Sequence, residues 1–202
     1  MNIEHIMRIA PVIPVLVVDD RIDPAALAVT LVAAGLPVIE VTLRTPEALN
    51  AIRAMAEVEG AIVGAGTVLD PDQLGESLDA GAKFIVSPGL TERLARAVIE
   101  SGVAYLPGVA TAGDLMRGLE LGLSDFKFFP AEAAGGLAAL SALAAPFTQA
   151  RFCPTGGIRA ETAASWLAHP SVLCVGGSWL APPGETDLAA IATRARVAAA
   201  LR

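Results

Sequence analysis

The segment Asp125-Phe126-Lys127-Phe128-Phe129-Pro130 places a lysine in the middle of an apolar run with the composition of a β-strand. Because side chains alternate along a strand, Lys127 and Phe129 point to one face and Phe126 and Phe128 point to the other. A charged ammonium group is costly to bury, and a buried lysine commonly avoids this cost by losing its proton. A neutral, desolvated lysine is a nucleophile that can form a Schiff base with a carbonyl compound.

The alternative is a structural lysine that reaches the surface or is held in a buried ion pair. The chain contains only two lysines, and arginine supplies nearly all of its other positive charge. The second lysine, Lys83, opens the strand-like run Phe84-Ile85-Val86, where exposure is easy. Burial and chemistry together favour a functional role for Lys127.

The lysine segment is one of eight short β-rich runs, each followed by a turn and a longer run rich in alanine and leucine. Strand and helix alternating in this way indicate βαβ units and a parallel sheet. Eight units predict a closed (β/α)8 TIM barrel, and 202 residues fit the lower end of the size range of that fold. A doubly wound open sheet is the alternative, but no dinucleotide-type glycine loop follows the first run. The runs are Val12–Val18, Val38–Leu43, Ala61–Ala65, Phe84–Ser87, Ala104–Leu106, Asp125–Phe129, Arg151–Pro154 and Val172–Val175.

Several helix-start signals support this α/β organisation. Asp23-Pro24, Thr45-Pro46 and Asp70-Pro71 each place a capping residue before a proline suited to the first helical turn. Thr91-Glu92, and Thr111 with Asp114, are weaker signals of the same kind. We expect a single barrel domain over residues 1–202, preceded by a short amphipathic N-terminal helix within Met1–Ala10.

Composition narrows the range of partners. The net charge of −7 and the pI near 4.8 argue against nucleic acid, and no basic cluster opposes this. The N-terminus lacks the apolar core of a signal peptide, and glycine, proline and polar residues interrupt the longest uncharged stretches, so we expect no membrane association. Cys153 and Cys174 lie in apolar runs, which indicates reduced, buried thiols in a cytoplasmic protein. No metal-type spacing of Cys and His is present, so we expect neither a metal nor a cofactor.

Active sites of such barrels lie at the C-terminal ends of the strands. Two consecutive loops at this end carry paired glycines, Gly156-Gly157 and Gly176-Gly177. Glycine lets backbone N–H groups approach an anion closely, a short helix N-terminus would add its dipole, and Ser178 adds a hydroxyl donor. The glycines could instead serve only tight turns, but their occurrence in both loops favours a phosphate site.

A second ionisable residue lies inside an apolar strand. Glu40, within Val38-Ile39-Glu40-Val41, is either half of a structural ion pair with Arg44 or Lys127 or a carboxylate that shuttles protons. Arg44 offers a planar fork for a carboxylate or phosphate, although an exposed arginine at a helix start is nearly as good an interpretation. Thr67 and Thr155 are generic hydroxyl donors at strand ends.

A lysine nucleophile, a carboxylate, an arginine and a phosphate cradle together suit reversible carbon–carbon cleavage of a phosphorylated keto compound through an imine and an enamine. The sequence also closely resembles the class I, Schiff-base family of 2-keto-3-deoxy-6-phosphogluconate (KDPG)/4-hydroxy-2-oxoglutarate aldolases. The resemblance runs from Pro11-Val12-Ile13-Pro14-Val15 to Gly176-Gly177-Ser178-Trp179. The motifs that carry it are Glu40-Val41-Thr42-Leu43-Arg44-Thr45, Val63-Gly64-Ala65-Gly66-Thr67-Val68-Leu69, Ser87-Pro88-Gly89, Phe126-Lys127-Phe128-Phe129-Pro130-Ala131-Glu132 and Arg151-Phe152-Cys153-Pro154-Thr155-Gly156-Gly157-Ile158.

The resemblance implies a role for each matching position. Lys127 would form the Schiff base, and Glu40 would move protons through a bound water. The remaining positions would line the substrate site: Arg44 and Thr67 at the substrate carboxylate, Pro88 in the pocket wall, Phe129 beside the imine, and Thr155, Gly156, Gly157, Gly177 and Ser178 at or near the phosphate.

The resemblance further implies a homotrimer that cleaves KDPG to pyruvate and D-glyceraldehyde 3-phosphate in the Entner–Doudoroff pathway. Related substrates stay open: 4-hydroxy-2-oxoglutarate, and the 6-phosphogalactonate epimer, because a site that does not bind the differing hydroxyl discriminates weakly. Two other classes also stay open. One is a phosphate-binding barrel isomerase or decarboxylase that forms no Schiff base, and the other is a non-catalytic phosphosugar-binding protein.

Overall fold

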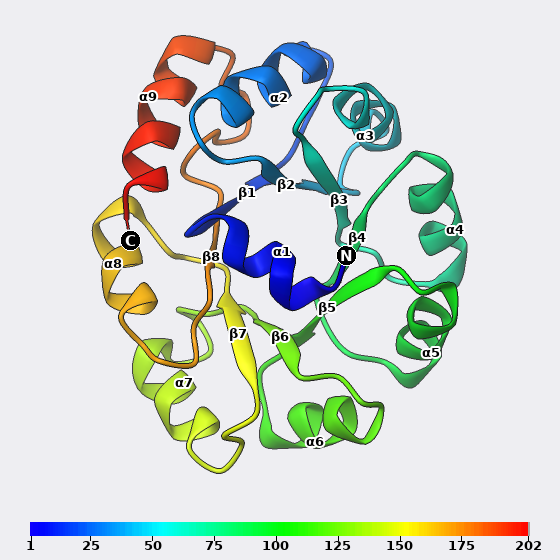
Figure 1. Cartoon of the computed structure of the whole chain (residues 1–202), viewed down its shortest axis with the longest axis vertical. Helices are drawn as coiled ribbons and strands as arrows, with labels where there is room; N and C mark the ends of the chain where they lie inside the picture. The colour runs from blue at the N-terminus through cyan, green and yellow to red at the C-terminus, as the bar shows by residue number, and fades with distance from the viewer. Residues whose placement is uncertain (202) are drawn as a thin grey trace.

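The computed structural model describes residues 1–201, and in this part of the chain eight parallel strands form a barrel surrounded by helices (Figure 1). Neighbouring strands are hydrogen-bonded in the order β7-β6-β5-β4-β3-β2-β1-β8. Isolated parallel bridges, Phe152 to Val172 and Thr155 to Gly176, join the two ends of this order. The predicted (β/α)8 architecture is therefore confirmed. The strands are β1 (Val12–Leu16), β2 (Val38–Thr42), β3 (Ile62–Gly66), β4 (Phe84–Ser87), β5 (Ala104–Val109), β6 (Asp125–Phe128), β7 (Arg151–Pro154) and β8 (Val175–Gly177).

The helices between the strands form the outer layer, and α9 lies beside α2, so that the last helix meets the first of the ring (Figure 1). Within residues 1–201, no helix is both long enough and apolar enough to span a membrane. The helices are α1 (Ile3–Ile9), α2 (Pro24–Ala33), α3 (Ala48–Ala56), α4 (Pro71–Asp79), α5 (Glu92–Ser101), α6 (Ala112–Glu120), α7 (Gly136–Ala144), α8 (Ala160–Leu167) and α9 (Leu188–Ala199).

Alternation along the strands divides the core into two parts. The larger part lies between sheet and helices and includes Phe126 and Phe128 of β6. The smaller part fills the barrel interior with residues such as Val38 and Phe84, which begin their strands. Because Ile6 and Met7 of α1 belong to this interior cluster, the N-terminal helix closes the N-terminal end of the barrel. The opposite, C-terminal end of the barrel carries the loops in which the predicted site residues lie.

Most predicted helix starts are confirmed. The Asp23 carboxylate accepts hydrogen bonds from the backbone N–H groups of Ala25 and Ala26, and Asp70 caps α4 in the same way. Thr91 caps α5, and Thr111 with Asp114 forms a complete capping box on α6.

The prediction for Thr45-Pro46 is wrong. The Thr45 hydroxyl donates instead to the backbone oxygen of Val18, 2.5 Å away on the preceding βα loop, and α3 begins only at Ala48. This long-range hydrogen bond uses the side chain that would otherwise have capped the helix.

The ends of some strands also differ from the predicted runs. The eighth run was expected at Val172–Val175, but β8 is Val175–Gly177, and Val172 makes only an isolated bridge. Glycines 176 and 177 are part of the strand because they pair with Ile13 and Pro14 of β1. Both cysteines are buried, as predicted, and neither forms a disulfide within residues 1–201.

Candidate active site

Lys127 and Glu40 form a buried ion pair inside the barrel. Lys127 Nζ lies 2.8 Å from Glu40 Oε1 and 3.2 Å from Oε2, and the two side chains are 7% and 3% exposed. Lys127 comes from β6 and Glu40 from β2. A buried ion pair of this kind is the structural alternative to a catalytic role for both residues. It is also the geometry that a proton transfer between amine and carboxylate requires.

Two glycines of β3 provide the space for this pair. A Cβ atom on Gly66 would lie 2.3 Å from Glu40 Oε1, and one on Gly64 would lie 2.4 Å from the Phe84 ring. Real Cβ contacts are never this short, so any larger residue at either position would displace its neighbour. Glycine is therefore required at both positions of β3 because side chains fill the barrel interior beside them: Phe84 beside Gly64, and Glu40 beside Gly66.

Phe129 follows Lys127 on the same face, as strand alternation predicted. Lys127 Nζ lies 5.6 Å from the centroid of the Phe129 ring, within the range of a cation–π contact.

Thr67, at the end of β3, adopts a left-handed backbone conformation with φ of 60°, which is uncommon for a residue other than glycine. Arg44 lies two residues beyond β2 and is exposed, and within residues 1–201 the structure gives its guanidinium group no hydrogen bond or ion pair.

The loop after β7 is glycine-dependent. Gly156 and Gly157 have φ values of 102° and 81°, a region that side chains other than glycine rarely adopt. Thr155 is buried, and its hydroxyl group lies directly against the α-carbon of Gly176. A Cβ atom on Gly176 would lie only 2.2 Å from Thr155 Oγ1. The β7 and β8 ends thus pack closely because Gly176 has no side chain.

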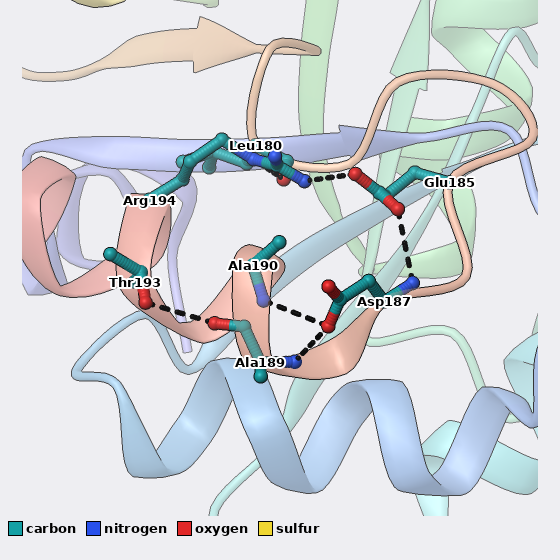
Figure 2. Close-up of polar contacts among 7 residues, drawn as sticks. All are labelled: Leu180, Glu185, Asp187, Ala189, Ala190, Thr193 and Arg194. Atoms are coloured by element: carbon teal, nitrogen blue, oxygen red, sulfur yellow. Dashed lines mark hydrogen bonds and ion pairs between the residues drawn. The ribbon is translucent and has the colours of Figure 1, made fainter.

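Gly177, the last residue of β8, packs against the ring of Trp179, and the exposed Ser178 begins the loop that follows. The short helix expected here is a turn at Trp179 and Leu180. Figure 2 shows how α9 holds this loop: Arg194 donates to the backbone oxygen of Leu180 and to Glu185 Oε2, each over 2.8 Å. The hydrogen bonds of Arg194 fix the loop within two residues of Ser178.

Pro88 lies at the end of β4 and is half-buried. Its carbonyl oxygen lies against Gly108, where a Cβ would approach to 2.2 Å. The preceding Ser87 Oγ donates to the backbone oxygen of Gly89 and hydrogen-bonds the Tyr105 hydroxyl, both at 2.7 Å. Burial raises the pKa of Tyr105 to about 12, so its hydroxyl stays protonated at neutral pH. These contacts fix the backbone on both sides of Pro88.

The structure thus brings Lys127, Glu40 and Phe129 together, and the other predicted residues lie at or just beyond the C-terminal ends of the strands. Sequence reasoning assigned no role to Arg194, Glu132 or Trp166. Arg194 holds the loop after β8, and Trp166 Nε1 donates to Glu132 Oε1 over 3.0 Å. No local pattern marks them, because each acts through a partner distant in sequence. Across residues 1–201, no cluster of three or more His, Cys, Asp or Glu could hold a metal ion.

A parallel barrel with a lysine–glutamate pair buried inside it is the arrangement expected of a (β/α)8 enzyme of the lysine-dependent aldolase class. The family model described as KDPG and KHG aldolase matches residues 3–194. The chain belongs to this aldolase family.

Individual relatives agree with this family. A 2-dehydro-3-deoxy-phosphogluconate aldolase of Zymomonas mobilis is 54% identical over 201 residues, which cover 100% of this chain and 97% of the relative. The crystal structure of a Zymomonas mobilis KDPG aldolase with 3-phosphoglycerate has a TM-score of 0.96 at 54% identity, covering 98% of this chain and 95% of that one. A KDPG aldolase from Legionella pneumophila, with pyruvate captured as a covalent carbinolamine, has a TM-score of 0.93 at 40% identity, covering 97% of each chain.

Proposed function

We propose that this enzyme is a class I aldolase that cleaves KDPG to pyruvate and D-glyceraldehyde 3-phosphate through a Schiff base on Lys127. The single observation that carries the proposal is the buried contact of 2.8 Å between Lys127 Nζ and Glu40 Oε1. It joins a nucleophile for the ketone to a carboxylate that can exchange protons with it. The covalent pyruvate of the Legionella relative supports this chemistry.

The reaction begins with proton transfer from the Lys127 ammonium group to the Glu40 carboxylate. The neutral amine attacks the C2 ketone of the substrate, and the resulting carbinolamine loses water to give a protonated imine. This cation is the electron sink for the next step. The initial transfer leaves Glu40 protonated, so Glu40 can donate the proton that departs with the hydroxyl group as water when the carbinolamine becomes the imine.

Carbon–carbon cleavage then follows from the imine. A base removes the proton of the C4 hydroxyl, the C3–C4 bond breaks, and its electron pair moves through C3 to the imine nitrogen, which gives an enamine. D-glyceraldehyde 3-phosphate leaves as the aldehyde. Protonation of the enamine at C3 and hydrolysis of the imine by water release pyruvate and regenerate Lys127. Glu40, acting directly or through a bound water, is the acid and base of these steps.

The remaining predicted residues would bind the two charged ends of the substrate. Arg44 and Thr67 would hold the carboxylate, with Phe129 beside the imine and Pro88 in the pocket wall. Positive φ values at Gly156 and Gly157 support a loop whose backbone N–H groups face a phosphate, together with Thr155, Gly177 and Ser178. The Zymomonas structure with 3-phosphoglycerate supports a phosphorylated ligand.

The assembly and location are part of the same proposal. We infer a cytoplasmic homotrimer that acts in the Entner–Doudoroff pathway on a small phosphorylated 2-keto acid, without a metal, a cofactor or a nucleic acid partner. The family resemblance supports the trimer, and the two buried cysteines, which form no disulfide within residues 1–201, support a reducing compartment.

A substrate panel tests the proposal. Pyruvate release is followed with a coupled lactate dehydrogenase assay for KDPG, its galactonate epimer and 4-hydroxy-2-oxoglutarate, with Lys127→Ala as the control. We expect the highest kcat/KM with KDPG and no cleavage of any of the three by the control. Faster cleavage of another substrate would reassign the preference, and cleavage by the folded control would exclude the Schiff-base mechanism.

A further inference from the structure

Glu132 links the lysine strand to the glycine loop after β7. It lies between β6 and α7, five residues beyond Lys127, and its side chain extends towards α8. Glu132 Oε1 accepts a hydrogen bond of 3.0 Å from Nε1 of Trp166, a residue that is only 2% exposed. An indole N–H group at such a buried position needs an acceptor, and Glu132 supplies it.

The same residue contacts both glycines of the loop. Its backbone N–H donates to the oxygen of Gly156 over 3.0 Å, and the preceding Ala131 N–H donates to the oxygen of Thr155 over 2.8 Å. A Cβ atom on Gly157 would lie 2.7 Å from both Cβ and Cγ of Glu132, so the side chain stem covers the α-carbon of Gly157. The loop is therefore held between the β6–α7 segment and the glutamate stem.

The carboxylate itself is poorly suited to contact the substrate, because a negative charge repels a phosphate. Its hydrogen bond to Trp166 instead anchors the stem that covers Gly157. We propose that Glu132 is a positioning residue that holds the Gly156–Gly157 loop in its phosphate-binding conformation and at a fixed distance from Lys127. It therefore sets the preference for phosphorylated over non-phosphorylated keto acids. This inference rests on the proposed function.

The test compares Glu132→Met with Glu132→Gln. Methionine retains the shape of the stem but cannot accept the indole hydrogen bond, whereas the glutamine oxygen can. For Glu132→Met we expect KM for KDPG to rise about fivefold to tenfold, the effect of losing one buried hydrogen bond. Its kcat for KDPG, its kcat/KM for 4-hydroxy-2-oxoglutarate and the trapping of pyruvate on Lys127 should stay unchanged. Glu132→Gln should retain the wild-type KM.

The matched control is Glu161→Met, which replaces an exposed glutamate in the first turn of α8, the helix that carries Trp166. It should leave every parameter at the wild-type value. Equal losses on both substrates in Glu132→Met would indicate a merely structural role and overturn the inference, as would an unchanged KM for KDPG. Failure of the proposed function is distinguishable, because the wild-type protein would then neither cleave KDPG nor trap pyruvate.

Discussion

Lys127 and Glu40 meet from opposite walls of the barrel, with Nζ 2.8 Å from Oε1. In the closed order of strands, β2 and β6 are separated by β3, β4 and β5 on one side and by β1, β8 and β7 on the other. Both residues have long side chains, which is what a contact across the interior requires. Because each charge is buried beside its partner, removing either side chain alters both the electrostatics and the proton balance of the site.

Glu40→Gln tests the carboxylate as a proton carrier. The amide keeps the size of the side chain and an oxygen that can accept from Lys127, but it cannot take up a proton. We expect kcat to fall by about 10²–10⁴, the usual contribution of a positioned acid or base. Steady-state kinetics and the inhibition constant of inorganic phosphate are measured together. Comparable losses in turnover and phosphate binding would mean that Glu40 is structural.

Gly66→Ala tests the space that the pair occupies. The added Cβ would lie 2.3 Å from Glu40 Oε1, so the carboxylate must move away from Lys127. We expect a folded protein with a severely reduced kcat. The matched control is Gly75→Ala in the middle of α4, where a Cβ would meet no atom within 4 Å. That control should keep full activity and gain about 0.5–1 kcal/mol of stability from helix propensity. Full activity in Gly66→Ala would contradict the geometry.

Asp125→Asn tests a buried carboxylate at the N-terminal end of β6, the strand that carries Lys127. Among residues 1–201, Asp125 Oδ1 is buried without a hydrogen-bond partner, while Oδ2 accepts from Ser124 Oγ over 2.7 Å. Burial raises the pKa of Asp125 above its ordinary value of 3.8, opposed by the Ser124 hydroxyl. The native state therefore holds this proton more tightly than the unfolded state, and its stabilising effect is lost as pH rises from 3.8 through the raised pKa.

Asparagine removes this dependence because it does not ionise. We expect Asp125→Asn to match the wild type in stability at about pH 3.5 and to exceed it at about pH 7, as measured by urea unfolding. The difference in free energy of unfolding should grow with pH between these limits. A difference that is constant with pH, or that favours the wild type at neutral pH, would contradict the prediction that ionising the buried Asp125 carboxyl group destabilises the native state.

Local signals in the sequence predicted most of the fold. The β-rich runs located the strands because their buried faces need apolar residues, and Asp23 and Asp70 cap helices through their own neighbouring N–H groups. Prediction failed where a distant partner decides the outcome. Thr45 has the local signature of a cap, but the backbone of Val18 takes its hydroxyl. Gly176 and Gly177 have the composition of a loop, but both belong to β8 because they pair with β1.

The candidate site shows the same division. Lys127 and Glu40 could be singled out from sequence because each places a charge in an apolar strand. The sequence left either Arg44 or Lys127 as the partner of Glu40. It could not decide between them, because the contact with Lys127 forms only when the barrel closes and brings together residues 87 positions apart. The hydrogen bond between Glu132 and Trp166 carries no sequence signal, since it joins residues 34 positions apart on different elements.

Borohydride trapping is the most direct test of a Schiff base on Lys127. The protein is incubated with pyruvate, reduced and digested, and the modified peptide is located by mass spectrometry, with Lys127→Ala treated in parallel. We expect a reduced pyruvyl adduct on Lys127 and none on the variant. A folded wild-type protein that carries no adduct, or an adduct on Lys83 instead, would contradict the Schiff-base mechanism and leave a phosphate-binding barrel without lysine catalysis.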